Sequence, residues 1–243
     1  RLKIMDLSDG SAQPMTDAQL GLSLAFNGAI YNFPELRSEL EALGYSFYSG
    51  GDTEVLLKGY HAWGEKLLPK LNGMFAFAIW ERDTQRLFIA RDRLGVKPLY
   101  LSRTDKRLRF ASALPALLKG GDISPMLDPV ALNHYLNFHA VVPAPRTLIA
   151  GIEKLPPATW MRIDANGKTE QQTWWTLPYG PHADEANLTL EDWRDRVLES
   201  TREAVAIRQR AAVDVGVLLS GGVDSSMLVG LLREVGVKDL STF

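Results

Sequence analysis

The chain has 243 residues, of which 46% are hydrophobic and 23% charged; its net charge is −2, and it contains no cysteine. This composition is typical of a globular protein with one large or two smaller domains, and the lack of cysteine excludes disulfides, thiolate metal sites and a cysteine nucleophile within these residues. Without a long apolar run or a Lys/Arg cluster, neither a membrane nor a nucleic-acid partner is expected; we expect a small soluble substrate and a cytoplasmic location.

In chain order, the first predicted element is a strand over residues 22–31, which a turn at Asn27-Gly28 should interrupt because both residues tolerate positive φ. Two helices are predicted next. One runs from Pro34, which suits a first turn, to Gly44, and the other begins at Thr53 as N-cap and ends near Gly64.

The middle of the chain predicts a covered hairpin. Residues 74–80 and 87–90 are apolar on both faces and are joined by a polar turn, so their sheet should lie between two layers. A helix is predicted over 128–137 and a strand over 159–163.

A second unit is predicted towards the end of the sequence. Residues 178–188 are rich in proline and poor in apolar side chains, which is typical of a linker. Thr189 should cap a long helix, and a buried strand over 213–219 should lead through a loop into a helix over 226–235. The chain starts at Arg1 rather than Met and stops on what reads as an entering strand, so both ends are expected to be internal to a longer protein.

The loop Ser220-Gly-Gly-Val-Asp-Ser-Ser226 has the features of a phosphate-binding loop. Adjacent glycines allow close approach of the backbone to an anion, and a helix N-terminus adds partial positive charge. No lysine follows, so this is not a GxxxxGK[ST] loop. A Gly-Gly turn with a capping Ser or Asp is the simpler alternative.

The sequence SGGxDS instead resembles the pyrophosphate loop of ATP-pyrophosphatases. The residues implied to bind ATP are Leu218, Ser220, Gly221, Gly222, Asp224, Ser225 and Ser226. Asp224 is also implied to help hold Mg²⁺.

Further motifs occur in the order of a known family. They are Arg1-Leu-Lys-Ile-Met-Asp-Leu-Ser8 with Gln13-Pro14, Asn27-Gly-Ala-Ile-Tyr-Asn32, Gly51-Asp-Thr-Glu-Val55, Leu71-Asn-Gly-Met-Phe-Ala-Phe77, Arg91-Asp-Arg-Leu-Gly-Val-Lys-Pro-Leu-Tyr100, Val142-Pro-Ala-Pro-Arg146 and Leu155-Pro-Pro157. With these motifs, essentially the whole chain resembles the asparagine synthetase (glutamine-hydrolysing) family, whose class II glutaminase domain precedes an ATP-pyrophosphatase domain.

This resemblance implies an α+β four-layer αββα sandwich of the N-terminal-nucleophile hydrolase type over residues 1–180. Residues 189–243 would then hold the first strand, loop and helix of an α/β parallel-sheet ATP-pyrophosphatase domain. The implied activity is glutamine hydrolysis to ammonia, followed by amidation of a carboxylate, most commonly aspartate, with ATP converted to AMP and pyrophosphate. The small-molecule partners are thus glutamine, ATP and the acceptor, and a homodimer is left open.

The resemblance also assigns a glutamine site. The Asn27 side chain and the Gly28 backbone N–H would form the oxyanion hole, with the glycine N–H presented by a strained turn. Arg1 would bind the α-carboxylate and Asp52 the α-ammonium group. The full implied set is Arg1, Leu2, Lys3, Ile4, Met5, Asn27, Gly28, Ala29 and Asp52. Taken singly, each has a simpler interpretation as a turn, a helix-start charge or a solvated end; their occurrence together in family order favours the site.

Two positions depart from the family pattern. The family nucleophile is an N-terminal cysteine some fifty residues before Arg1, and Ala29 replaces a frequent glutamate. The alternatives are therefore amidation of a different carboxylate, such as a peptide or cell-wall precursor, or a non-catalytic glutamine- or nucleotide-binding module. A tRNA-modifying enzyme is disfavoured by the missing basic surface. Arg91 and Asp92 are interpreted as structural residues that position the loop after their strand.

Overall fold

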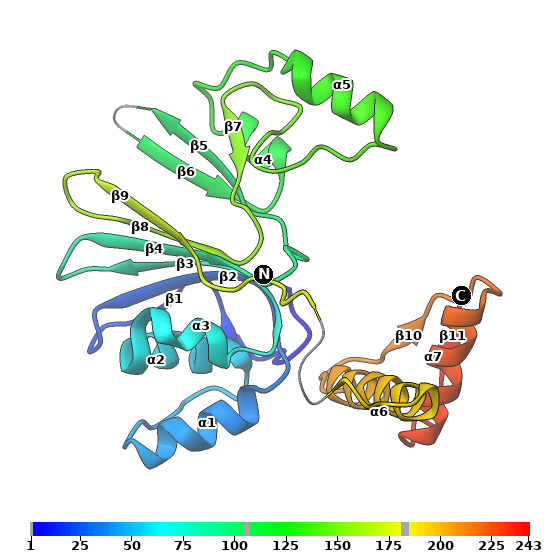
Figure 1. Ribbon diagram of the computed structural model, residues 1–243. Helices are drawn as coiled ribbons and strands as arrows, with labels where there is room; N and C mark the ends of the chain where they lie inside the picture. The colour runs from blue at the N-terminus through cyan, green and yellow to red at the C-terminus, as the bar shows by residue number, and fades with distance from the viewer. Residues whose placement is uncertain (1, 105–106, 181–184) are drawn as a thin grey trace.

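The computed structural model describes residues 2–104, 107–180 and 185–243, and its first part is built on a six-stranded antiparallel sheet (Figure 1). The strand order is β1-β2-β3-β4-β8-β9. The strands are β1 (Met15–Asp17), β2 (Leu22–Ile30), β3 (Gly73–Glu81), β4 (Arg86–Arg91), β8 (Thr159–Ile163) and β9 (Thr169–Thr173). The predicted hairpin is therefore confirmed as β3–β4, at the centre of this sheet.

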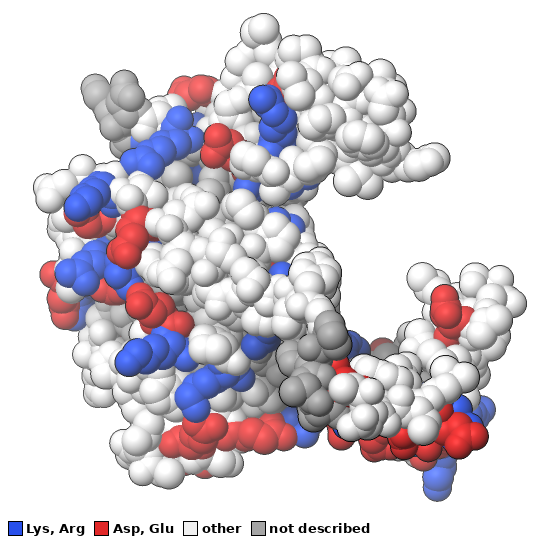
Figure 2. Space-filling view, in the orientation of Figure 1, with Lys and Arg blue, Asp and Glu red and all other residues white. Residues whose placement is uncertain are grey.

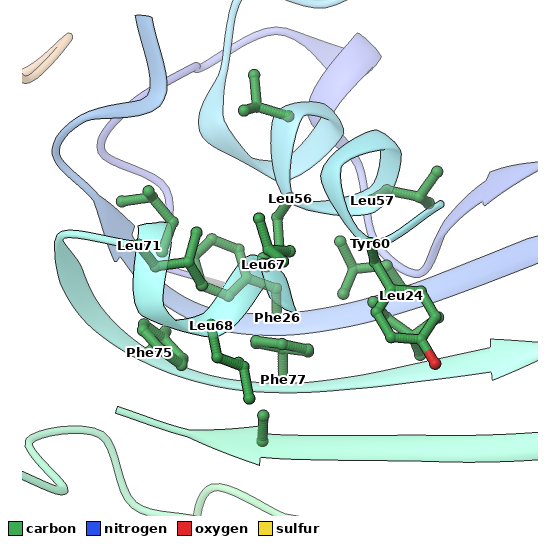
Figure 3. Close-up of a cluster of buried hydrophobic side chains, with 14 of the residues drawn as sticks. Leu24, Phe26, Leu56, Leu57, Tyr60, Leu67, Leu68, Leu71, Phe75 and Phe77 are labelled. Atoms are coloured by element: carbon green, nitrogen blue, oxygen red, sulfur yellow. The ribbon is translucent and has the colours of Figure 1, made fainter. Parts of the chain in front are cut away.

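A helical layer covers one face of the six-stranded sheet. It contains α1 (Phe33–Ala42), α2 (Asp52–Trp63) and α3 (Leu67–Lys70), with short 3₁₀ turns η1 (Asp9–Ser11) and η2 (Gly64–Lys66) nearby. Leucines of α2 and α3 pack against phenylalanines of β2 and β3, and Figure 3 shows this core from within. In this core, the apolar side chains that alternate along β2 pack against the apolar side chains that α2 directs toward the sheet with its helical repeat of 3.6 residues.

The other face of the sheet packs on a second, three-stranded sheet. Its order is β6-β5-β7, with β5 (Tyr100–Thr104), β6 (Arg107–Ala111) and β7 (Ile152–Lys154). Small residues Ala76 and Ala78 of β3 meet Leu99 and Leu101 between the sheets. Helices α4 (Leu114–Lys119) and α5 (Pro129–Asn137) lie beyond this second sheet (Figure 1). The order helix, sheet, sheet, helix confirms the predicted four-layer α+β sandwich.

The last part of the chain forms a small α/β unit. Helix α6 (Leu190–Arg208) begins with a capping box in which Thr189 and Asp192 bond each other's backbone N–H groups. Two short strands, β10 (Gly216–Val217) and β11 (Ser241–Thr242), pair in parallel and flank α7 (Val223–Glu234). The parallel pairing and the strand, loop and helix order agree with the fold class predicted for this part of the chain.

The structure corrects three sequence predictions. Strand β2 continues through Asn27 and Gly28 and pairs with β3 along its whole length, so no turn interrupts it. The N-cap of α2 is Gly51, and Thr53 lies inside the helix because the chain already turns at the Gly-Gly pair. Helix α7 starts at Val223, three residues earlier than predicted, since Gly222 supplies its N-cap.

A fourth correction concerns the strand predicted over residues 213–219. Only Gly216 and Val217 form a strand, and Leu218 is 81% exposed. Strands of a parallel sheet are buried only when neighbours and helices cover both faces, and among the described residues β10 pairs with no strand other than β11. The predicted linker over 178–188 lies partly outside the described residues.

The surface in view carries charges of both signs. Figure 2 shows Lys and Arg interspersed with Asp and Glu, while the end formed by α5 is nearly free of charge. Exposed apolar side chains there include Leu136 and Phe138. Among the described residues, no helix is both long enough and apolar enough to cross a membrane.

Candidate functional site

The predicted oxyanion residues lie on β2, and among the described residues no strand pairs with its second edge beyond Leu24. Strand β1 pairs with β2 only from Leu22 to Leu24. Further along, side chains take the place of a neighbouring strand: the Phe26 N–H donates to Gln13 Oε1 at 2.7 Å, and the Ile30 N–H donates to Asp52 Oδ2 at 2.9 Å. Backbone groups alternate along a strand, so the N–H of Gly28 faces this same edge, between Gln13 and Asp52.

Gly28 is required by close packing of two strands. A Cβ added here would lie 2.2 Å from the carbonyl oxygen of Met74 and 2.8 Å from Cα of Phe75 on β3. Its backbone is not in the left-handed region, so the predicted strained turn is wrong. The glycine instead lets β3 approach closely while the N–H points away from that strand.

The side chain of Asn27 faces the opposite side of the sheet from the core phenylalanines. It lines a cavity of about 190 Å³ between the two sheets, together with Gln13, Phe110 and Ser112 among others. Asn27 and Gly28 thus offer an amide N–H₂ group and a backbone N–H from adjacent positions, which are the two donors that an oxyanion hole needs. Ala29, next in sequence, is fully buried and has no polar side chain to offer.

Asp52 lies at the start of α2 and is buried, with 4% of its surface exposed. Burial raises the pKa of its carboxyl to about 6, against the opposing effect of the hydrogen bond from Ile30 N–H. A second oxygen, Oδ1, is 3.5 Å from Thr53 Oγ1. A buried carboxylate favours a cationic partner, which agrees with the predicted contact to an α-ammonium group.

The segment expected to bind the α-carboxylate is only partly described, since Arg1 lies outside the described residues. Leu2 to Met5 form an irregular segment with partly exposed side chains, except for exposed Lys3. The carbonyl of Ile4 accepts a hydrogen bond of 2.7 Å from the N–H of Ala212. That carbonyl therefore joins the first part of the chain to the α6–β10 connection.

A bidentate ion pair reinforces this junction. Arg210 donates to both carboxylate oxygens of Glu35 at 2.7 Å and to the carbonyl of Tyr31 at 2.8 Å. The same hydrogen bonds lower the pKa of the Glu35 carboxyl and raise that of Arg210. The guanidinium of Arg208 lies 4.9 Å from the ring centre of Tyr31. The junction thus contacts the chain directly after β2.

The predicted phosphate loop connects β10 to α7. Gly221 has φ +79°, a conformation that favours glycine, and Gly222 caps the helix. The hydroxyls of Ser225 and Ser226 donate to the carbonyl of Gly222 at 3.1 and 2.8 Å. The structure therefore places Ser220 to Ser226 together at one helix N-terminus, with the Ser220 and Ser225 hydroxyls 3.2 Å apart.

Asp224 is exposed in the first turn of α7. In the part of the chain that the structure describes, no group of three or more His, Cys, Asp or Glu side chains could hold a metal ion. A single carboxylate fits Mg²⁺ only in the manner of nucleotide sites, where phosphate oxygens and water complete the coordination. Leu218, the remaining predicted ATP contact, lies before the loop and is exposed.

Arg91 and Asp92 build the loop after β4, as interpreted from the sequence. The Arg91 guanidinium donates to the carbonyls of Lys97, Leu155 and Gly95 at 2.6 to 2.7 Å. The Asp92 carboxylate accepts from the N–H groups of four residues, Phe75, Leu94, Val96 and Lys97. Both charges are thus satisfied by backbone, and they fix the loop beside Leu99 of the cavity.

Sequence reasoning gives no role to Gln13, Asp6 or Glu54, which the structure places around the site. Gln13 and Asp6 stand inside the motifs that carry the family resemblance, and Glu54 follows Asp52 by two positions. Gln13 and Asp6 accept from backbone N–H groups that are distant in sequence, those of Phe26 and Gly50, whereas Glu54 accepts from the nearer Ser49 and pairs with Lys58. A local pattern does not reveal such contacts, so only the motifs themselves could have drawn attention to these residues.

Comparison with known families divides the chain in the same way as the fold. A family model described as a glutamine amidotransferase domain matches residues 1–175, and a second model, described as asparagine synthase, matches residues 196–243.

Several curated proteins are similar over nearly the whole chain. Asparagine synthetase [glutamine-hydrolyzing] 1 of Bacillus subtilis (strain 168) is 38% identical over 96% of this chain and 36% of its own length. Asparagine synthetase [glutamine-hydrolyzing] 3 of the same organism is 33% identical over 95% of this chain and 37% of its own length. Amidase chry2 of Gibberella zeae is 33% identical over 97% of this chain and 34% of its own length. The chain therefore spans about a third of the length of these relatives.

Among solved structures, glutamine phosphoribosylpyrophosphate amidotransferase from B. subtilis, complexed with ADP and GMP, aligns with a TM-score of 0.49 at 18% identity. The alignment covers 98% of this chain and 49% of that structure. The family assignment depends instead on the matched model, which accounts for residues 1–175 of 243. The chain belongs to the glutamine amidotransferase domain family, in the form found in glutamine-hydrolysing asparagine synthetases.

Proposed function

We propose that this chain forms the glutamine site and the beginning of the ATP site of a glutamine-dependent amidotransferase. In this proposal residues 1–180 are the glutaminase domain, and residues 189–243 open an ATP-pyrophosphatase domain. The protein would hydrolyse glutamine to ammonia and use ATP, converted to AMP and pyrophosphate, to amidate a carboxylate, with aspartate as the first candidate. The relatives named as glutamine-hydrolysing asparagine synthetases support this choice.

The open edge of β2 is the observation that carries the proposal. Three successive outward N–H groups lie along it, and the outer two are taken by Gln13 and Asp52. The central one belongs to Gly28, which follows Asn27 in sequence, and the Asn27 side chain lines an inter-sheet cavity. Hydrolysis of the glutamine side-chain amide passes through an anionic tetrahedral state, which such preorganised donors stabilise.

Substrate recognition would use residues around this edge. Asp52 would pair with the α-ammonium group and Arg1 with the α-carboxylate, with backbone of residues 2–5 and 28–29 completing the pocket. The family nucleophile, an N-terminal cysteine that forms a thioester, is not among these 243 residues. The role of this chain is to hold the substrate and to stabilise the oxyanion.

The loop from Ser220 to Ser226 would hold the phosphates of ATP. Its helix N-terminus and the backbone N–H groups around Gly221 and Gly222 favour an anion. Asp224 is the residue that would hold Mg²⁺ against the phosphates, and the bound ion would neutralise their charge. The acceptor carboxylate would attack ATP and release pyrophosphate, which gives an acyl adenylate. Ammonia from the first site would then displace AMP and leave the amide.

A second candidate concerns the acceptor. Relatives named amidases, including Amidase chry2 of Gibberella zeae, are 33% and 30% identical to this chain. Because these names do not name asparagine synthesis, we propose amidation of a carboxylate other than aspartate as the alternative. Amidation of a peptide or cell-wall precursor is one form of it. The same two sites in this chain would serve either acceptor.

The experiment that tests this function uses the full-length protein with glutamine, ATP and Mg²⁺ in the presence of aspartate or of other carboxylic acids. Glutamate, AMP and the amide product are measured separately. The proposal expects glutamate release together with acid-dependent AMP formation. Glutamate release without AMP formation would overturn the proposed ATP site. AMP formation that ammonia supports but glutamine does not would overturn the proposed glutamine site. The acid that stimulates AMP formation identifies the acceptor.

A further inference from the structure

Asp6 joins two segments that are far apart in the sequence. Its Oδ1 accepts a hydrogen bond of 2.7 Å from the N–H of Ser8, and its Oδ2 accepts from Ser11 Oγ at 2.6 Å and from the N–H of Gly50 at 3.1 Å. The carboxylate therefore holds the end of the segment 2–5, which directly precedes it, against the loop that leads into α2.

The packing around Asp6 leaves no room for a different loop path. A Cβ added to Gly51 would lie 2.7 Å from Cβ of Asp6 and 3.0 Å from Ser11 Oγ. Gly51 is the residue before Asp52 and the N-cap of α2. The contact with Asp6 thus fixes the backbone position from which the Asp52 carboxylate is presented.

The far side of the same loop is held by a buried ion pair. Glu54 accepts from the N–H and the hydroxyl of Ser49, both at 2.7 Å, and pairs with Lys58. Lys58 also donates to the carbonyl of Ser46, and both charged side chains are at least nine-tenths buried. The loop 46–51 is therefore a rigid connection, and Asp6 is the link between it and the segment 2–5.

We propose that Asp6 is a positioning residue for glutamine. It sets the spacing between the segment 2–5, which follows Arg1 in sequence and whose backbone completes the proposed pocket, and the Asp52 carboxylate that would receive the α-ammonium group. This inference rests on the proposed function. The two charged groups of an amino acid are attached to one carbon atom, so their receptors must keep a fixed separation. A displacement of either receptor moves the side-chain amide away from the oxyanion donors on β2.

Asp6 keeps its negative charge, and with it its hydrogen bonds between the two segments, over a wide pH range. Hydrogen bonding, led by the Ser11 hydroxyl, lowers the pKa of its carboxyl to about 2, so it stays ionised throughout the working range of an enzyme. Hydrogen bonds to an ionised acceptor are shorter and stronger than those to a neutral one. Replacement by an amide of the same shape removes this strength while keeping the packing against Gly51.

The test compares variants of the full-length protein in glutamine hydrolysis and in ammonia-supported synthesis. Asp6→Asn is expected to raise the KM for glutamine by about tenfold, the factor for weakening a hydrogen bond to a charged group, while ammonia-supported turnover is retained. Ser11→Ala, which removes one donor, should raise KM by a smaller factor. Combined with Asp6→Asn it should add little, because the two changes act on one contact. Asp9→Asn, at an exposed neighbour of Ser11, is the matched control.

Asp52→Asn separates this inference from the proposed function. If Asp52→Asn raises KM but neither Asp6→Asn nor Ser11→Ala does, Asp6 has no positioning role. Loss of glutamine-dependent and ammonia-dependent activity in equal measure in the Asp6 and Ser11 variants would also overturn the proposal, since a general folding defect affects both. If Asp52→Asn leaves KM unchanged, the assigned ammonium contact itself is wrong.

Discussion

In the proposed function, two regions of this molecule would present backbone N–H groups to an anion, and their structures differ. On β2 the donor belongs to an extended strand whose surroundings are packed and buried, and its direction is fixed by pairing with β3. In the 220–226 loop the donors belong to a helix N-terminus, and most of the side chains around them are exposed. The first arrangement suits one small, short-lived charge, whereas the second suits a large, highly charged ligand that brings its own cation.

The largest expected effect lies in the exposed region. Asp224→Ala should reduce ATP-dependent synthesis by about 10³-fold or more with either glutamine or ammonia, because metal-assisted charge stabilisation is worth several kcal/mol. AMP formation by the full-length protein measures this. Asp239→Ala removes the same charge from an exposed position beyond α7 and should be close to wild type. Retained synthesis in Asp224→Ala would remove the phosphate-loop assignment.

The next effect separates the two regions. Asn27→Ala should lower glutaminase turnover by roughly 10²–10³, the cost of one oxyanion donor, and leave ammonia-supported synthesis intact. Glutamate release and amide formation are measured in parallel, with Asn187→Ala, at an exposed position before α6, as control. An unchanged glutaminase rate would show that Asn27 is not a donor to the oxyanion.

A stability measurement tests the packed character of the β2 site. Gly28→Ala should lower the free energy of unfolding by about 1 to 3 kcal/mol, because the new methyl group overlaps the backbone of β3. Gly222→Ala should lower it less, by about 0.5 kcal/mol, because alanine is the poorer N-cap but its Cβ meets no atom closer than the Ser220 hydroxyl at 3.5 Å. Thermal unfolding of both variants tests the contrast; equal effects would contradict it.

The smallest expected effect is a pH dependence of the KM for glutamine, which the buried carboxyl of Asp52 should cause. The pKa of Asp52 is raised to about 6, so below this pH the carboxylate is protonated and loses its attraction for an ammonium group. The KM for glutamine should therefore rise by about tenfold per pH unit below 6, while ammonia-supported synthesis lacks this dependence. A KM that stays flat between pH 7 and 5 would contradict the assignment.

The same raised pKa has a consequence for stability. Because the folded-state pKa lies above the ordinary value of 3.8, the native state binds the proton more readily than the unfolded chain between these two values. The buried charge therefore opposes folding above about pH 6 and this cost is relieved as the pH falls. Asp52→Asn should accordingly stabilise the protein more at pH 8 than at pH 5, as measured by thermal unfolding.

The sequence predicts the layers of the fold well because their signals are local. The apolar runs of β3 and β4, the cap at Thr189 and the glycine after α1 each act within a few residues. Gly28 is different: the Asn-Gly pair is a strong turn signal, but the reason for the glycine is a strand that lies about 45 residues further along the chain.

The site residues also divide into those that the motifs indicate and those contacts that only the folded structure reveals. The resemblance supplies Asn27, Gly28 and Asp52, yet the contact that joins them, from Ile30 N–H to Asp52, spans 22 residues and is invisible to a local pattern. The apolar residues 213–219 show the reverse error. Their composition predicts burial, but burial depends on neighbouring strands, and in the described part of the chain β10 pairs with no strand other than β11.

The side chains on the β2 edge also occupy positions at which a further strand would pair. An unpaired strand edge is a template on which a strand of another molecule can form a ladder of hydrogen bonds. Gln13 and Asp52 already accept from the N–H groups on either side of Gly28, so an incoming strand finds only one donor between two occupied positions. The edge can therefore remain open to a small molecule while it resists intermolecular strand pairing.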